Sequence, residues 1–166
     1  MSADRPPRKA GTRKDIHERA LGLLAARQRS RRELERRLVH AGFESDAVEA
    51  ELVRLERVGL IDDEAFARAV VQSRIDHRGE SRRAVAGRLA QAGVDAAVAV
   101  QALDELTGDE QVRADSLAAG RVSRLAGLEP KAAYQRLFGF LGRRGYPPEV
   151  ARRAARSALA ADVPEE

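Results

Sequence analysis

Residues 34–43 of this 166-residue chain read LERRLVHAGF, and their pattern of two apolar residues, a glycine and a further large apolar residue occurs three times. The later copies place these residue types at Val85, Leu89, Gly93 and Val94, and at Leu137, Leu141, Gly145 and Tyr146. Successive glycines are 51 and 52 residues apart. Apolar residues spaced by four share one face of a helix, and glycine directly after a helix favours a left-handed C-terminal stop. The period predicts stacked helical units, which usually offer a binding surface rather than a catalytic pocket.

Helical spacing of apolar residues continues on both sides of the three copies, from Asp15 almost to the C-terminus. Ser30 with Glu33, and Thr107 with Glu110, have the spacing of capping boxes, which begin helices. Alternating strand patterns are absent, and β-branched and aromatic residues are scarce. We therefore predict an all-α protein with nine helices in three tandem three-helix repeats. The predicted segments are a basic disordered tail at 1–14, repeats at 15–60, 61–107 and 108–160, and an acidic frayed end at 161–166.

The composition excludes several classes of functional site. The chain has no cysteine, which excludes disulfides and thiol chemistry, and no stretch has the roughly 20 apolar residues of a membrane span. His17, His40 and His77 have no second histidine at helical spacing, which argues against a metal site. The acidic run at 62–64 begins a predicted helix, where carboxylates stabilise the N-terminus. Because phosphate-loop and nucleophile motifs are also absent, we predict a cytoplasmic protein that is not an enzyme and has no cofactor.

The charges are unevenly distributed along the chain. Residues 1–14 carry a net charge of +4, and the remaining 25 basic and 25 acidic residues cancel. In each repeat, the predicted second helix and the residues that flank it are basic. In the first two repeats, the predicted third helix is acidic. Arginines crowd together at 27–32, 78–83 and 152–156. Either neighbouring acidic helices neutralise them, or an anion, a nucleic acid or an acidic protein surface relieves their repulsion.

Residues 59–67 read GLIDDEAFA, and Arg74, Gly79, Arg82, Arg83, Leu89 and Gly93 follow them. This stretch resembles the signature of the RecX family, and residues 30–34 and 143–146 match the family in the other two repeats. The resemblance extends over about residues 16–160. It implies a curved, elongated monomer made of three three-helix repeats. It also implies a regulator that docks along the RecA–DNA filament and inhibits the ATP hydrolysis, strand exchange and coprotease activity of RecA, in DNA repair and the SOS response.

On this resemblance, we expect the partners to be RecA, its filament and, weakly and without sequence preference, the backbone of single- and double-stranded DNA. The basic second-helix faces would contact DNA or acidic RecA surfaces, and the acidic third helices would contact basic RecA surfaces. The predicted contact residues are Arg31, Arg32, Arg36, Arg37, Arg78, Arg82, Arg83, Arg88, Arg143, Arg144, Arg152, Arg153 and Arg156.

Two other functions remain compatible with the same residues. A stand-alone helical DNA-binding protein would read a groove of duplex DNA and show a sequence preference. A general interaction scaffold, whose arginines are only solvated, would have no affinity for DNA or filaments at physiological salt.

Overall fold

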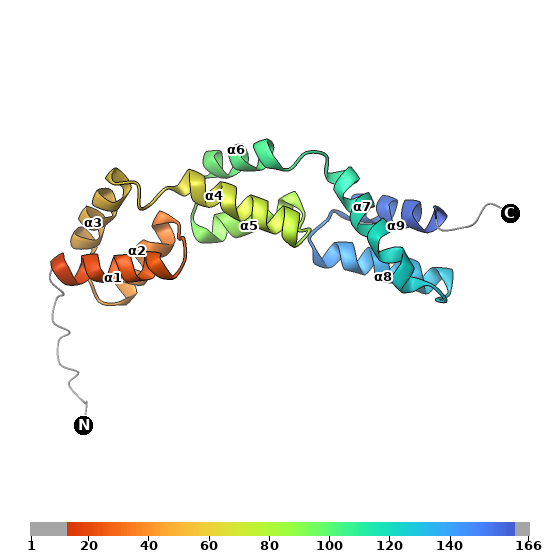
Figure 1. Cartoon of the computed structure of the whole chain (residues 1–166), viewed down its shortest axis with the longest axis horizontal. Helices are drawn as coiled ribbons and strands as arrows, with labels where there is room; N and C mark the ends of the chain where they lie inside the picture. The colour runs from red at the N-terminus through yellow and green to blue at the C-terminus, as the bar shows by residue number, and fades with distance from the viewer. Residues whose placement is uncertain (1–12, 162–166) are drawn as a thin grey trace, which may run out of the picture.

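The computed structural model describes residues 13–161, which form nine α-helices and no β-strand. The helices make three bodies that follow one another in a curved row (Figure 1). The first repeat contains α1 (Arg13–Ala26), α2 (Arg31–His40) and α3 (Ser45–Arg57). The second contains α4 (Asp63–Gln72), a π-helical turn (Ser73–His77), α5 (Arg82–Ala92) and α6 (Ala96–Leu106). The third contains α7 (Glu110–Val122), a 3₁₀ turn (Ser123–Leu125), α8 (Pro130–Arg143) and α9 (Pro148–Ala160).

Each repeat has its own hydrophobic core. The apolar residues of the repeated pattern that precede the glycines are all 0% exposed, namely Leu34, Leu38, Val85, Leu89, Leu137 and Leu141. The spacing of four therefore identified the buried face of every second helix. The core of the third repeat also contains several fully buried alanines, among them Ala114, Ala118 and Ala151, which allow helices to pack closely. These findings confirm the predicted all-α fold of three-helix repeats.

The second helices of the first two repeats begin at serine caps. The Oγ atom of Ser30 accepts a hydrogen bond from the backbone N–H of Glu33, at 3.1 Å. The Oγ atom of Ser81 accepts one from the backbone N–H of Ala84, also at 3.1 Å. Each bond satisfies a helix N–H that has no partner within its own helix. The predicted start of the second helix at Ser30 is confirmed.

The predicted capping box of Thr107 and Glu110 at the start of α7 is wrong. Asp109 is the N-cap residue, and its carboxylate accepts hydrogen bonds from the first free N–H groups of the helix. Thr107 is the C-cap residue of α6, and its buried hydroxyl donates to a carbonyl of α6 at 2.7 Å. Because Thr107 belongs to the end of one helix, it is not available to begin the next. Glu110 instead binds the N-terminus of α5, as described below.

Helix α1 begins at Arg13, two residues before the predicted start at Asp15. The predicted tail at 1–14 is therefore too long at its C-terminal end. Arginine and lysine have good helix propensity, and Asp15 lies in the first turn, where a negative charge stabilises the helix. The rest of the predicted tail, and the predicted frayed end from residue 162 onward, lie outside the described residues.

The repeated glycine has a second role at the contacts between repeats. Gly93 and Gly145 have φ values of +78° and +87°, in the left-handed region that favours glycine. A Cβ atom on Gly93 would lie 2.5 Å from the Cβ of Arg32, and one on Gly145 would lie 2.7 Å from the Cβ of Ala84. Arg32 and Ala84 belong to the first turns of α2 and α5. Because it has no side chain, each glycine lets its own repeat come close to the start of the second helix in the preceding repeat.

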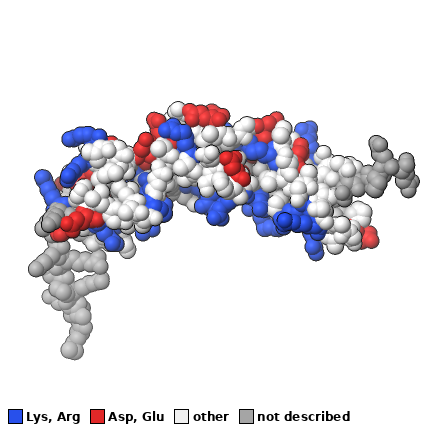
Figure 2. All heavy atoms as spheres, in the orientation of Figure 1, with Lys and Arg blue, Asp and Glu red and all other residues white. Residues whose placement is uncertain are grey.

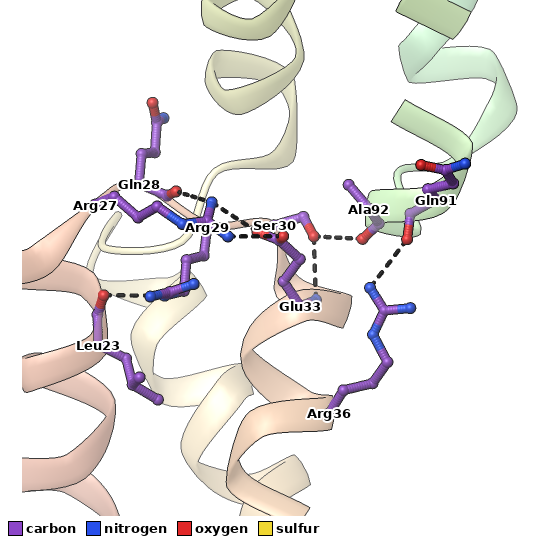
Figure 3. A network of polar contacts seen from close by, with 9 residues as sticks. All are labelled: Leu23, Arg27, Gln28, Arg29, Ser30, Glu33, Arg36, Gln91 and Ala92. Carbon is purple, nitrogen blue, oxygen red and sulfur yellow. Dashed lines mark hydrogen bonds and ion pairs between the residues drawn. The ribbon is translucent and has the colours of Figure 1, made fainter. Parts of the chain in front are cut away.

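The second helices α2, α5 and α8 meet head to tail at these contacts. At the first junction, the Oγ atom of Ser30 donates a hydrogen bond to the carbonyl of Ala92 at 2.5 Å (Figure 3). At the second, the backbone N–H of Ser81 donates to the carbonyl of Arg144 at 2.9 Å. The partly positive start of one helix faces the partly negative end of the next, which stabilises both ends.

A carboxylate from the following repeat completes each junction. Asp63, the first residue of α4, accepts a hydrogen bond from the backbone N–H of Arg31 at 2.8 Å. Glu110, the first residue of α7, accepts one from the backbone N–H of Arg82 at 2.9 Å. Arg31 and Arg82 are the first residues of α2 and α5, so the two junctions repeat the same contact. Because both junctions contain this contact, the second repeat packs against the first in much the same way as the third packs against the second.

We expect Gly145→Ala to lower the free energy of unfolding by about 2–4 kcal/mol, the sum of left-handed backbone strain and overpacking at the junction. The Cβ of Ala84, which the new methyl would meet, is attached directly to the helix backbone and has no other rotamer. Urea unfolding measures the loss of stability, and small-angle X-ray scattering reports whether the third repeat changes its position.

Gly59→Ala is the matched control for this variant. Gly59 also has a left-handed φ, of +72°, but a Cβ there would meet no atom within 4 Å. The control carries backbone strain without a clash and should lose only about 1–2 kcal/mol. Equal losses in the two variants, with unchanged scattering, would contradict the docking role of Gly145.

Candidate nucleic-acid interface

Two of the predicted contact arginines hold the helices of their own repeats together. Arg31 lies 2.6 Å from Glu49 and 2.9 Å from Glu56, both on α3. Arg82 has the equivalent position in the second repeat and pairs with Asp104 of α6 at 2.5 Å. The hydrogen bond that Arg31 donates to Glu49 raises the pKa of Arg31. The guanidinium donors of both residues are directed at carboxylates of this protein, so they stabilise the contact between the second and third helices.

Arg88 has a comparable structural role. It binds the carboxylate of Glu80, which is only 8% exposed, at 2.6 Å, and Arg74 lies 3.3 Å from the same carboxylate. Burial raises the pKa of Glu80, but the hydrogen bond and charge of Arg88, together with Arg74, outweigh burial and lower the pKa overall. A buried carboxylate between two guanidiniums is thus kept charged, and Arg88 is bound within the second repeat.

The arginines crowded at 27–32 also find partners inside the protein (Figure 3). Arg27 donates two hydrogen bonds to the carboxylate of Glu33, and the Nε of Arg29 donates to a carbonyl of α1. Burial and the charge of Arg27 lower the pKa of Arg29. Arg36 donates to a backbone carbonyl near the end of α5, across the first junction. Three of the four arginines at 27–32 therefore pair with carboxylates of this protein, and the fourth, Arg29, binds a backbone carbonyl.

Two further predicted residues form ion pairs on the surface. Arg32 pairs with Glu35 and Arg152 pairs with Glu149, each at 2.6 Å and three residues apart on one helix. Exposed pairs of this kind contribute little free energy, because water and salt compete for both charges. Arg32 and Arg152 therefore remain accessible to a partner.

The remaining predicted contact arginines belong to none of the ion pairs found within residues 13–161. All of them are exposed except Arg144, which is half-buried. They are Arg37, Arg78, Arg83, Arg143, Arg144, Arg153 and Arg156. In these residues the guanidinium charge is not balanced by a neighbouring carboxylate.

Sequence reasoning missed three arginines that the structure brings to the same place. Arg121 lies on α7, Arg124 lies on the 3₁₀ turn that follows it, and Arg136 lies on α8. They line one hollow together with Arg143. With Arg144 these residues form what we call the third-repeat basic cluster: Arg121, Arg124, Arg136, Arg143 and Arg144. Arg136 and Arg143 are seven residues apart, so the sequence already indicated that they share one face of a helix. The position of α7 beside this face depends on how the helices pack.

The third-repeat basic cluster is organised around Phe140. The guanidinium carbons of Arg121 and Arg144 lie 4.3 Å and 3.9 Å from the centre of its ring. Burial lowers the pKa of Arg144, and the positive charge of Arg121 lowers it further. The Nε of Arg144 also donates to the carbonyl of Arg78, at 3.2 Å. Like charges are thus held close together by a ring and by backbone, with no carboxylate of the described residues within ion-pair distance of either guanidinium.

Over the second and third repeats, acidic and basic residues gather mainly on different edges, whereas over the first repeat basic residues also lie at the upper edge and acidic residues at the lower edge (Figure 2). In the view of Figure 2, acidic residues lie mainly along the upper edge, over α4 and α6, and basic residues lie along the lower edge, under α5 and over α8. This distribution gives the second and third repeats one edge suited to a polyanion and another suited to basic groups.

Other kinds of site have less support in the described part of the chain. His17 lies 2.6 Å from Glu51 as a single pair, and no group of three metal-ligating side chains occurs within residues 13–161. None of the described helices is long and apolar enough to cross a membrane.

Models of the RecX family match the chain in three successive segments. The first three-helix domain of RecX matches residues 17–55, the second matches residues 62–103 and the third matches residues 109–155. The chain belongs to the RecX family. The three matched domains of the RecX family coincide with the three helical bodies described above.

Relatives named regulatory protein RecX resemble the chain over most of its length. The protein of Mycobacterium avium is 40% identical over 161 residues, which cover 95% of this chain and 93% of the relative. The protein of Streptomyces coelicolor is 42% identical over 142 residues, covering 84% and 74%. The crystal structure of RecX from Lactobacillus salivarius has a TM-score of 0.74 at 18% identity, covering 89% of this chain and 97% of that one. The sequence relatives support a regulatory role of the RecX type, and the structural likeness concerns the fold.

We expect Glu80→Gln to lower the free energy of unfolding by about 1–3 kcal/mol at neutral pH, because two guanidiniums lose their shared charged partner. The folded protein has a lowered Glu80 pKa, so the carboxylate stabilises the fold above the ordinary carboxyl pKa. This contribution is lost as the pH falls through the lower, folded value. The stability difference between the two proteins, measured by urea unfolding at several pH values, should therefore shrink on acidification.

Glu149→Gln is the control for a surface pair. The Glu149 side chain is 82% exposed, and its loss should change stability by no more than about 0.5 kcal/mol. A Glu80→Gln effect as small as this control, or one that does not depend on pH, would contradict the role given to Glu80.

Proposed function

We propose that this protein binds the RecA–DNA filament and lowers the ATP hydrolysis, strand exchange and coprotease activity of RecA. Membership of the RecX family, over most of the chain and most of each relative, carries the proposal. A protein that binds one conformation of a filament more tightly than others shifts the filament toward that conformation. Inhibition then follows if the favoured conformation hydrolyses ATP slowly.

The arrangement of the repeats supports binding to an extended, repetitive target. Three bodies in a curved row bring several modest patches to one long surface (Figure 1). Each patch that binds raises the effective concentration of the next, so weak contacts add up to useful affinity. The separation of acidic and basic edges suits a filament that presents both protein and DNA phosphates (Figure 2).

We assign the filament contacts to the predicted arginines that have no carboxylate partner. Arg78 and Arg83 flank the start of α5 and are exposed, whereas Arg82 between them is bound to Asp104. The same distinction removes Arg31 and Arg88 from the set, because their donors already bind carboxylates. Binding to naked DNA should be weak and independent of sequence, because phosphate contacts carry no base information.

The proposed function is tested by titrating the protein into RecA from the same organism, during ATP hydrolysis on single-stranded DNA. We expect inhibition by the unmodified protein. We expect the double variant Arg78→Ala, Arg83→Ala to need about tenfold more protein for half-inhibition, the change that a loss of about 1.4 kcal/mol of binding free energy produces.

The matched control is the double variant Arg54→Ala, Arg57→Ala, which removes the same charge from exposed positions on α3. It should inhibit within about twofold of the unmodified protein. If the folded, unmodified protein has no effect on RecA at saturation, the proposed function is wrong. Tight, sequence-dependent binding to duplex DNA would then favour the stand-alone DNA-binding protein.

A further inference from the structure

The guanidiniums of the third-repeat basic cluster keep their hydrogen-bond donors free. A guanidinium that lies over an aromatic ring is held by the ring face and by van der Waals contact, and its N–H groups point outward in its own plane. Arg121 and Arg144 lie over Phe140 in this way, at 4.3 Å and 3.9 Å from the ring centre. The ring therefore limits the movement of two cations without using their N–H donors. Of these donors, the Nε of Arg144 binds the backbone carbonyl of Arg78.

The second helices of the first two repeats, α2 and α5, contain arginines whose donors bind carboxylates. At the start of α2 and α5, Arg31 and Arg82 give their donors to carboxylates of the same repeat. Arg88 on α5 gives its donors to Glu80. In the third repeat no ion pair of the described residues includes any member of the cluster. The cations of the cluster thus lie together without an ion pair, whereas α2 and α5 have unpaired arginines, such as Arg37 and Arg83, beside paired ones.

The cluster also has a shape that can hold a ligand. Arg121, Arg124, Arg136 and Arg143 line one hollow, with Phe140 at its wall and the amide of Gln135 as a further polar group. No acidic residue lines this hollow. Arg143 also lines an adjacent hollow with Arg144, toward the second repeat. The two hollows share Arg143, but the second is also lined by Glu80, the partner of Arg88, so only the first is lined without a carboxylate.

We propose that the third-repeat basic cluster is the principal nucleic-acid contact of this protein and binds consecutive backbone phosphates of the DNA in the filament. The role in the filament rests on the proposed function, whereas the phosphate site itself does not. Guanidiniums bind phosphate oxygens through two parallel N–H groups, and free donors are what such a site requires.

Phosphates suit the site better than an acidic protein surface does. A nucleic-acid backbone carries one negative charge per nucleotide without interruption, so several cations in one hollow can each find an anion. A protein surface rarely offers so many carboxylates without basic residues between them. Base stacking has no support here, because Phe140 is buried and its ring contacts two guanidiniums. Recognition should therefore be independent of sequence.

The test is binding of a fluorescent thymidine oligonucleotide, measured by anisotropy over a range of salt concentrations without RecA. The variant Arg124→Gln, Arg136→Gln, Arg143→Gln removes three exposed charges and leaves the arginines over Phe140 in place. On single strands, each lost phosphate contact lowers the slope of log K against log salt by about 0.7, so the slope should fall by about 2. Affinity at low salt should fall on the order of tenfold or more, equally for oligonucleotides of other sequences.

Two further variants control for charge and for folding. Arg54→Gln, Arg57→Gln, Arg68→Gln removes the same charge from α3 and α4 and should keep the slope and affinity of the unmodified protein. Arg124→Lys, Arg136→Lys, Arg143→Lys keeps every charge and should keep most of the slope, with affinity reduced only a few-fold. Helicity measured by circular dichroism confirms that each variant is folded.

The outcomes separate the phosphate site from the proposed function. A glutamine variant that is folded and binds naked DNA with an unchanged slope overturns the phosphate site. If that variant also loses inhibition of RecA, the occupant is an acidic protein surface of the filament. If the slope falls as expected while neither this variant nor the unmodified protein affects RecA, the phosphate site stands and the proposed function fails.

Discussion

The contact between the start of one second helix and the glycine-containing end of the next determines how the three repeats are arranged. It combines a left-handed glycine that admits the neighbouring helix, a serine cap that faces a helix C-terminus, and a carboxylate from the following repeat. None of these groups is strong alone, but together they satisfy helix-end N–H and carbonyl groups in the space between repeats. Because Gly93 and Gly145 occupy the same position in their repeats, the second junction repeats the geometry of the first.

The arginines at the starts of α2 and α5 bind both within and between repeats. The side chains of Arg31 and Arg82 bind carboxylates on α3 and α6 of their own repeats. The backbone N–H groups of the same two residues bind carboxylates on α4 and α7 of the following repeats. The guanidiniums of Arg31 and Arg82 are thus neutralised inside their own repeats and become part of the fold. The third repeat has no repeat after it among the described residues, so α8 does not form this contact at its N-terminus. The arginines of the third-repeat basic cluster lie around Phe140, and no carboxylate of the described residues forms an ion pair with them.

Most of the fold was predictable because it depends on local periodicity. The spacing of Leu34 and Leu38, and of their equivalents, identified the buried faces, and Ser30 marked a helix start correctly. The error at Thr107 arose because capping patterns do not reveal whether a residue still belongs to the preceding helix. The candidate site was predicted less well. Arg143 and Arg144 were predicted from the basic second-helix segment of the third repeat and from the family resemblance. Arg121 was missed because its position beside Phe140 depends on the packing of α7 against α8.

The amino-acid order alone was sufficient to establish an all-α chain of three similar units with basic second helices. The features that show this are helix periodicity, glycine stops and clusters of arginines, which depend only on residues close together in the chain. Which of those arginines remain free was decided by packing. An ion pair requires two groups to lie within about 4 Å, and the carboxylates that neutralise Arg31 and Arg82 lie many residues away along the chain. The concentration of unpaired charge in the third repeat therefore emerged only when the helices were placed against one another.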